Sequence, residues 1–186
     1  MKAVIDTNVL LVANKKHKNV SRQCVCECVR RLVEMEKHGV VVIDDAFLVL
    51  TEYLQKTSPN QPKGAGDVFL KWLLRNSSNP KHVSQVKITP ASGKGFAEFP
   101  DSDGAKAALK DFDSSDRKFV AISNAHPDKP VIWQASDGKW LNWHDALNQA
   151  GIHVDFLCPD DECRFFASKF PDKATPAFCT ARNNQN

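Results

Sequence analysis

The fold of this chain is decided by its opening stretch, Ala3-Val4-Ile5-Asp6-Thr7-Asn8-Val9-Leu10. Residues 3–5 predict a short buried strand, and residues 9–14 follow as an apolar run without a turn residue. We therefore expect a helix to begin at Thr7 or Asn8. Ligands of open α/β sheets bind just beyond the carboxyl ends of the strands, and Asp6 lies at such an end. Asp6 is equally suited to serve only as the helix N-cap, because Asp, Thr and Asn all favour that position.

Length and charge set broad limits. With 186 residues the chain fits one domain that has a sizeable core. The formal net charge of +3 neither demands nor excludes nucleic acid as a ligand. We expect no signal peptide, because strand-like residues begin at once, and we find no apolar run long enough to span a bilayer. These features predict a cytoplasmic protein that does not enter a membrane.

The cysteines predict neither a disulfide framework nor a metal site. The chain is longer than the small secreted proteins that depend on disulfides. Cys24 and Cys28 share one face of a predicted helix, and Cys26 points away from it. The remaining cysteines are Cys158, Cys163 and Cys179. Their spacing is irregular and no paired CxxC is present, which disfavours zinc, so we expect reduced, mostly buried thiols.

Beyond the opening stretch, strand-like and helix-like segments alternate. Strands are expected at 40–43, 83–88, 131–135 and 153–157. Helices are expected at 21–36, 46–56, 67–76 and 143–150, with another capped by Asp113 or Ser114 and a short one around 165–169. Residues 181–186 are expected to be disordered. This alternation predicts an α/β fold in which helices cover both faces of a mostly parallel sheet.

Acids in the second strand–helix unit have different expected roles. Asp44 and Asp45 end the strand and directly precede a helix, so we expect capping. Glu52 lies one turn beyond Leu48 and Val49, at spacings that bring side chains together. It is therefore either a partly buried acid, which needs a partner or a metal, or an exposed Glu on a mixed face.

Asp116 lies at the start of a helix and shares one face with Phe119 and Val120. If these apolar residues face the sheet, Asp116 looks inward with them, while Arg117 and Lys118 point elsewhere. The alternative is that Asp116 only interacts with the helix dipole, which favours acids in the first turn.

A fourth acid ends a strand in the same way as the first. Asp137 follows strand 131–135 and has Ser136 beside it, as Asp6 has Thr7. The expected topology brings together Asp6, Glu52, Asp116 and Asp137. Clustered carboxylates repel one another unless cations bind them, and oxygen-only ligands suit Mg²⁺ or Mn²⁺. Such a site activates water and steadies the leaving oxygen of a phosphodiester displacement.

Four segments of the chain together resemble the PIN-domain nucleases. Residues 4–10 look like the opening motif of that family, and residues 115–121 resemble the helix that carries its third acid. Residues 135–137 resemble its fourth-acid strand end, and residues 151–154 its closing turn and strand. The similarity runs in order from Met1 to about Leu157.

The resemblance implies a three-layer α/β/α sandwich, bound Mg²⁺ or Mn²⁺, and cleavage of RNA. The implied catalytic and metal-binding acids are Asp6, Glu52, Asp116 and Asp137. The expected supporting groups are Thr7, Asn8, Asp113 and Ser136. The candidates for nucleic-acid contact are Lys15, Lys16, Lys18, Arg117 and Lys118. Glu52 matches the family less firmly than the other acids, because Glu34 or Glu36 can be argued instead.

The resemblance also bears on organisation and partners. It assigns residues 1–157 to a PIN-like nuclease domain and leaves 158–186 as a partly disordered extension. Expected partners are RNA, an antitoxin or other inhibitory protein, and a second copy of the chain. The main alternative is a catalytically silent PIN-like module that binds RNA or a partner. A metal-dependent phosphatase is less favoured, because no Gly-rich phosphate loop is present.

Overall fold

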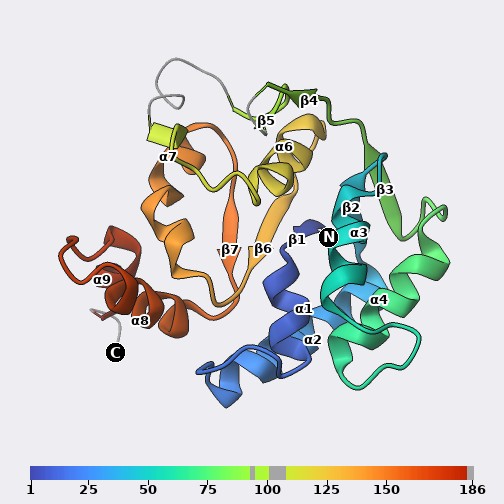
Figure 1. Ribbon diagram of the computed structural model, residues 1–186, viewed down its shortest axis with the longest axis horizontal. Helices are drawn as coiled ribbons and strands as arrows, with labels where there is room; N and C mark the ends of the chain where they lie inside the picture. Colours follow the sequence, from blue (N-terminus) through green and yellow to red (C-terminus); the bar gives the residue numbers. More distant parts are fainter. Residues whose placement is uncertain (93–94, 101–107, 184–186) are drawn as a thin grey trace.

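A computed structural model describes residues 1–92, 95–100 and 108–183 of the chain, and a parallel sheet forms its centre (Figure 1). The strands of this sheet are β1 (Lys2–Ile5), β2 (Val40–Asp44), β3 (Val83–Val86), β6 (Val131–Gln134) and β7 (Val154–Phe156). They lie in the order β3-β2-β1-β6-β7, and every neighbouring pair is parallel. Two short strands, β4 (Pro90–Ala91) and β5 (Gly95–Phe96), form a separate antiparallel pair.

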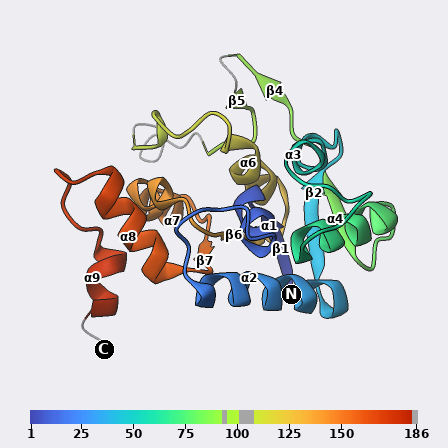
Figure 2. The same cartoon turned by 60° about the horizontal axis from the view of Figure 1, so that its bottom comes forward.

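Helices cover both faces of the sheet. They are α1 (Thr7–Ala13), α2 (Arg22–His38), α3 (Leu48–Lys56), α4 (Ala65–Asn76), α6 (Arg117–Ala125), α7 (His144–Gln149), α8 (Pro159–Lys169), α9 (Ala177–Asn183) and the 3₁₀ helix η1 (Gly138–Asn142). Figure 2 shows α2 along one side of the sheet and α6 on the other, where α6 contacts β1, β2 and β6. The predicted three-layer α/β/α fold is confirmed. Among the described residues, no helix combines the length and the apolar character needed to cross a membrane.

The central strands form because their apolar residues are buried on both faces. Residues 3–5 and 41–43 are almost completely inaccessible, as expected for strands of a covered parallel sheet. Asp44 ends β2 and accepts hydrogen bonds from the backbone N–H groups of Leu48 (2.7 Å) and Val49 (3.0 Å). The predicted capping role of Asp44 is therefore confirmed.

The neighbouring strands β1 and β6 form the topological switch point of the sheet, where the strand order changes direction. From β1 the chain moves outward in one direction through β2 and β3, and it later returns to β6 and moves outward through β7. Ile5 pairs with Trp133, and the Asp6 N–H donates to the Trp133 carbonyl at 2.9 Å. The carboxyl ends of β1 and β6 therefore lie side by side, at the place where open α/β sheets bind ligands.

The C-terminal segment contains more helix than its sequence predicts. Helix α8 begins at Pro159, six residues before the expected helix around 165–169, and Pro is favoured in the first helical turn. Helix α9 extends to Asn183, and residues 184–186 lie outside the described part of the chain, so the expected disorder of residues 181–186 stays a prediction. Helix α8 packs closely on η1, since a Cβ at Gly138 would lie 2.5 Å from the Phe166 nitrogen. The boundary at residue 157 stays a prediction.

The expectation of reduced cysteines is wrong for four of the six. One disulfide joins Cys24 on α2 to Cys158, and a second joins Cys163 on α8 to Cys179 on α9. Cys26 is exposed and free, and Cys28 is buried and free. Helical spacing shows which cysteines share a face of α2, but it does not show that α8 returns to that face from more than a hundred residues away.

Candidate active site

Asp6 lies where β1 ends and α1 begins. Its side chain is only 2% exposed and accepts a hydrogen bond from the Asn8 N–H at 2.7 Å, so it caps α1 as well as facing the sheet edge. Burial raises the pKa of Asp6 well above its ordinary value, and the charge of Asp116 raises it further. The Asn8 N–H lowers this pKa, while the charges of Asp137 and Glu52 raise it. Capping and membership of the acidic cluster therefore coexist.

Lys139 holds three of the acids together. Its ammonium lies 2.5 Å from Asp113 Oδ2, 3.0 Å from Asp116 Oδ2 and 3.2 Å from Asp137 Oδ2. Burial opposes the charged form, but the bond to Asp113 and the charges of Asp116 and Asp137 outweigh it and raise the pKa of Lys139. The three carboxylates thus converge on one point, and a cation already fills it.

Asp116 stands at the N-cap position of α6 but makes no capping hydrogen bond. Its Oδ2 accepts from Trp140 Nε1 at 3.2 Å, and its side chain is 13% exposed. Burial raises the pKa of Asp116, Lys139 lowers it, and the charges of Asp137 and Asp113 raise it. The carboxylate therefore points inward, as the shared face with Phe119 and Val120 predicts, and does not act as a cap.

Glu52 reaches the same region from α3. Its Oε1 accepts from the Thr7 hydroxyl at 2.5 Å, and its Oε2 pairs with Lys118 Nζ at 2.5 Å. The interpretation of Glu52 as an inward-facing acid fits this placement. Glu34, one of the two alternatives to Glu52, instead makes an exposed ion pair with Arg30 on α2 at 3.0 Å.

The expectation that Lys118 points away from the acids is wrong. Only 11% of its side chain is exposed, because its long stem runs back along α6 to Glu52. Its ammonium also donates to the Ser115 carbonyl. Arg117 donates to the carbonyls of Phe112 (3.2 Å) and Lys110 (2.7 Å), so part of its hydrogen-bonding capacity serves the preceding loop.

The remaining lysine candidates are accessible. Lys15, Lys16 and Lys18 are all exposed in the loop between α1 and α2. His17, from the same loop, lines a cavity of about 430 Å³ together with Asn8, Ser136 and Asp137. This cavity connects the acidic cluster with the basic loop. A second cavity, of about 490 Å³, borders Glu52 and Lys118 on the side of β4 and β5.

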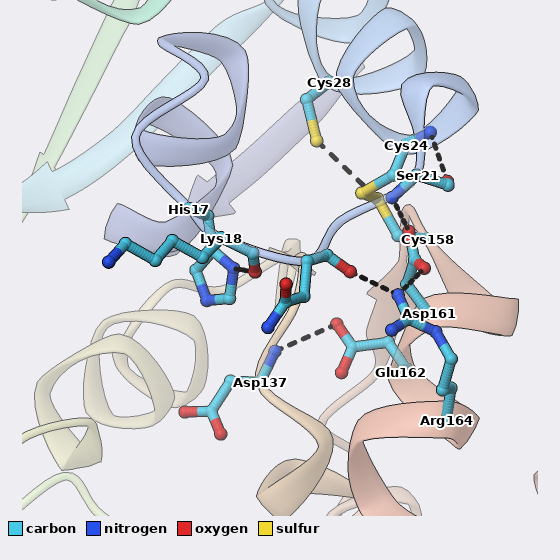
Figure 3. Close-up of a disulfide and its surroundings, with 11 residues drawn as sticks. His17, Lys18, Ser21, Cys24, Cys28, Asp137, Cys158, Asp161, Glu162 and Arg164 are labelled. Atoms are coloured by element: carbon cyan, nitrogen blue, oxygen red, sulfur yellow. Dashed lines mark hydrogen bonds and ion pairs between the residues drawn. A yellow bond between two sulfur atoms is a disulfide. The ribbon is translucent and has the colours of Figure 1, made fainter.

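Glu162 supports the position of Asp137, and Ser136 precedes it in an uncommon backbone conformation. Ser136 is buried and has a φ of 66°, which is uncommon for a residue other than glycine. Glu162 on α8 is completely buried, and its Oε1 accepts from the Asp137 N–H at 3.3 Å (Figure 3). Burial, and next the charge of Asp137, raise the pKa of Glu162 well above its ordinary value. Glu162 Oε2 and the Ser136 hydroxyl have no hydrogen-bond partner within the described part of the chain.

Sequence reasoning found the acids but missed Lys139, Trp140 and Glu162. Lys139 and Trp140 belong to η1, which directly follows Asp137, and their side chains reach Asp116 at the start of α6. Tyr53 was also missed, although its buried hydroxyl donates to the Ile5 carbonyl at the end of β1. Pro159 was the available signal for an earlier start of α8, which would have placed Glu162 on a helix.

The chemical type of these donors suits a hard divalent cation, but within the described part of the chain no three of the acids bring ligand oxygens within 4.8 Å of one another, so the side chains would have to move closer to hold one. Carboxylate oxygens are the ligands that Mg²⁺ and Mn²⁺ prefer, and Asp6, Asp116, Asp137 and Glu52 offer them from four different elements. Together with Asp113 they carry more negative charge than Lys139 and Lys118 neutralise. The Lys139 ammonium marks where three of these carboxylates already hold a positive charge.

No family model, curated protein or solved structure matches this chain. The resemblance to the PIN-domain nucleases therefore stays a prediction carried by the sequence motifs.

Proposed function

We propose that this protein is a metal-dependent endoribonuclease that uses Mg²⁺ or Mn²⁺. The observation that carries the proposal is the convergence of Asp113, Asp116 and Asp137 on one ammonium, beside the buried Asp6. This cluster lies at the switch point of a parallel sheet, where the fold favours ligand binding.

Metal binding, support of the acids and RNA binding would fall to different residues of the chain. Asp6, Glu52, Asp116 and Asp137 would hold the metal, which when bound supplies an activated water and stabilises the leaving oxygen of the phosphodiester. The supporting groups Thr7 and Glu162 hold Glu52 and the Asp137 backbone in place. The exposed residues Lys15, Lys16 and Lys18 would bind RNA phosphates, since such contacts give affinity without reading sequence.

A catalytically silent PIN-like module that binds RNA or a protein is the second candidate. The ion pairs of Lys139 and Lys118 favour it, because both lysines neutralise carboxylates that a metal would otherwise need. If this module is silent, the lysines are permanent counterions. If it is a nuclease, Lys139 would have to leave Asp116 and Asp137 for these carboxylates to hold a metal.

Location and further partners are part of the same proposal. We propose an antitoxin-like inhibitory protein and a second copy of the chain as partners, on the family resemblance alone. The cytoplasmic location is likewise proposed from the sequence. The two disulfides weigh against it, because stable disulfides are rare in the reducing cytosol.

The test is a cleavage assay on a mixture of single-stranded and structured RNAs, with chelator and with added Mn²⁺ or Mg²⁺. Asp6→Asn keeps the cap, because Asn caps as well as Asp, but it removes one carboxylate. Asp45→Asn is the matched control, since Asp45 also follows a strand end but is exposed.

We expect metal-dependent cleavage by the wild-type protein and by Asp45→Asn, and none by Asp6→Asn. RNA binding should survive in Asp6→Asn, because the lysine contacts remain. Binding of RNA without cleavage by the wild-type protein would support the silent module. Cleavage that persists after thorough chelation would end the metal hypothesis.

A further inference from the structure

Three buried sulfur atoms gather where α2 meets the start of α8. Cys24 and Cys28 lie one turn apart on α2, and Cys158 is the residue that precedes α8 (Figure 3). All three are buried, and their Sγ atoms lie within 4.8 Å of one another. Cys24 and Cys158 form a disulfide, while the Cys28 thiol stands 3.8 Å from Cys158 Sγ.

This arrangement matches the geometry of thiolate metal sites. Thiolates about 2.3 Å from a tetrahedral zinc ion lie about 3.8 Å apart, which is the spacing between Cys28 and Cys158. The Cys24 sulfur lies within 4.8 Å of the other two. To place all three sulfurs around one ion, only the bonded sulfurs of Cys24 and Cys158 must move apart. The first two ligands come from a rigid helix at positions i and i+4, which is a common way to present two metal ligands.

We propose that Cys24, Cys28 and Cys158 form a binding site for a soft divalent metal ion of the zinc class when the Cys24–Cys158 disulfide is reduced. Reduction requires a thiol or phosphine reductant, which gives two electrons, and two protons are taken up to form two thiols. Metal binding then releases the protons of all three thiols and forms three metal–sulfur bonds.

The surroundings supply a fourth ligand and a compensating charge. A cavity of about 300 Å³ borders Cys24 and Cys158, and it can hold the water that completes a tetrahedral site. Arg31 lines the same cavity. A divalent ion with three thiolates carries one excess negative charge. The Arg31 guanidinium offsets it only in part, because it also pairs with Glu27 at 3.0 Å and Asp155 at 2.5 Å.

The site has a structural consequence for α8. In the oxidised chain the disulfide ties this helix to α2, and the Ser21 N–H also donates to Asp161 at 2.8 Å. In the reduced chain the metal replaces the disulfide as the link. Glu162 would therefore remain against Asp137 under both conditions. The proposal does not rest on the nuclease function.

The experiment uses the full chain, reduced with a phosphine and titrated with Co²⁺, whose sulfur ligation gives thiolate charge-transfer absorption. We expect this absorption at one Co²⁺ per chain in reduced protein, its loss on adding Zn²⁺, and its absence from oxidised protein. Binding at the carboxylates does not produce the thiolate bands, so the two sites are distinguishable.

Two variants and a control locate the ligands. Cys28→Ser leaves the disulfide intact, so its fold can be checked in the oxidised state by circular dichroism, and the absorption should be lost after reduction. Cys26→Ser changes an exposed cysteine of the same helix and should retain it. The double variant Cys163→Ser/Cys179→Ser should also retain it. Reduced, folded protein without the bands, or a Cys28→Ser variant that keeps them, would overturn the proposal.

Discussion

Replacing Lys139 by Met tests whether its ammonium occupies the place of a metal. Met keeps most of the apolar stem and removes the charge that contacts three carboxylates. The metal-free variant should be less stable, because Asp116 and Asp137 are left mostly buried without their counterion. Its affinity for Mn²⁺ should rise, because the ion no longer competes with an ammonium.

The magnitudes follow from the contacts. Two unit charges about 4 Å apart interact with about 4 kcal/mol at an effective dielectric constant of about 20. Removing one member of a buried ion pair costs about 3–5 kcal/mol. The Lys139 side chain is 17% exposed and that of Asp113 is 36% exposed, so solvent screening places the expected loss below that range, at about 2–3 kcal/mol. If half of this stabilising energy must be given up when Mn²⁺ binds to the wild-type protein, the affinity of Lys139→Met for Mn²⁺ should be about tenfold higher.

The assay combines denaturant unfolding without metal and calorimetric titration with Mn²⁺. Lys2→Met is the matched control, because Lys2 makes one exposed ion pair, with Asp128 at 2.6 Å. Such surface pairs contribute about 0–1 kcal/mol, and Mn²⁺ affinity should not change. A folded Lys139→Met protein that binds Mn²⁺ no more tightly than the wild type would refute the assignment of Lys139 to the cation position.

Three further outcomes follow from the same structure. Without metal, the contribution of Asp6 and Asp116 to stability should fall as pH rises above the ordinary carboxyl pKa, because their raised pKa values make the folded state bind more protons. The lowered pKa of Asp113 acts in the opposite direction, so the measurement is the difference in thermal melts between the wild type and Asp6→Asn, which should lose less stability as pH rises. Glu162→Ala should lower the free energy of unfolding by about 2–3 kcal/mol, because the Asp137 N–H loses its acceptor. Glu162→Gln keeps an oxygen at that position and should lose less stability. Equal losses of the two variants in denaturant unfolding would contradict this reasoning. Asp44→Ala should lower stability by about 1–2 kcal/mol in the same measurement through loss of the α3 cap, and Asp44→Asn should change it little.

The sheet and its acidic edge could be predicted because their signals are local. β-branched runs such as residues 40–43 indicate covered strands, and Asp6 and Asp137 each follow such a run directly. Parallel strands place their carboxyl ends at one edge, so the order of elements was enough to bring these acids together. Glu52 and Asp116 followed from helical periodicity.

The contacts that neutralise the acids could not be predicted in the same way. Lys139 reaches Asp116 from η1, a short 3₁₀ helix of five residues whose sequence does not indicate which side chains face α6. The pairing of Cys24 with Cys158 joins positions 134 residues apart. Long-range pairing depends on how α8 packs, and no local pattern encodes that.

Lys139 and a bound metal would compete for the same carboxylates. Several carboxylates held close together in a water-poor site repel one another, and that repulsion destabilises the folded chain. Lys139 and Lys118 relieve it, so the folded chain carries its own counterions for these carboxylates. The same ion pairs must be broken or rearranged when a divalent cation binds. A silent module has no reason to break them, whereas a nuclease needs Lys139 to move. The Mn²⁺ affinity of Lys139→Met therefore tests whether the ammonium occupies a cation site, and metal-dependent cleavage by the wild-type protein decides between the two functions.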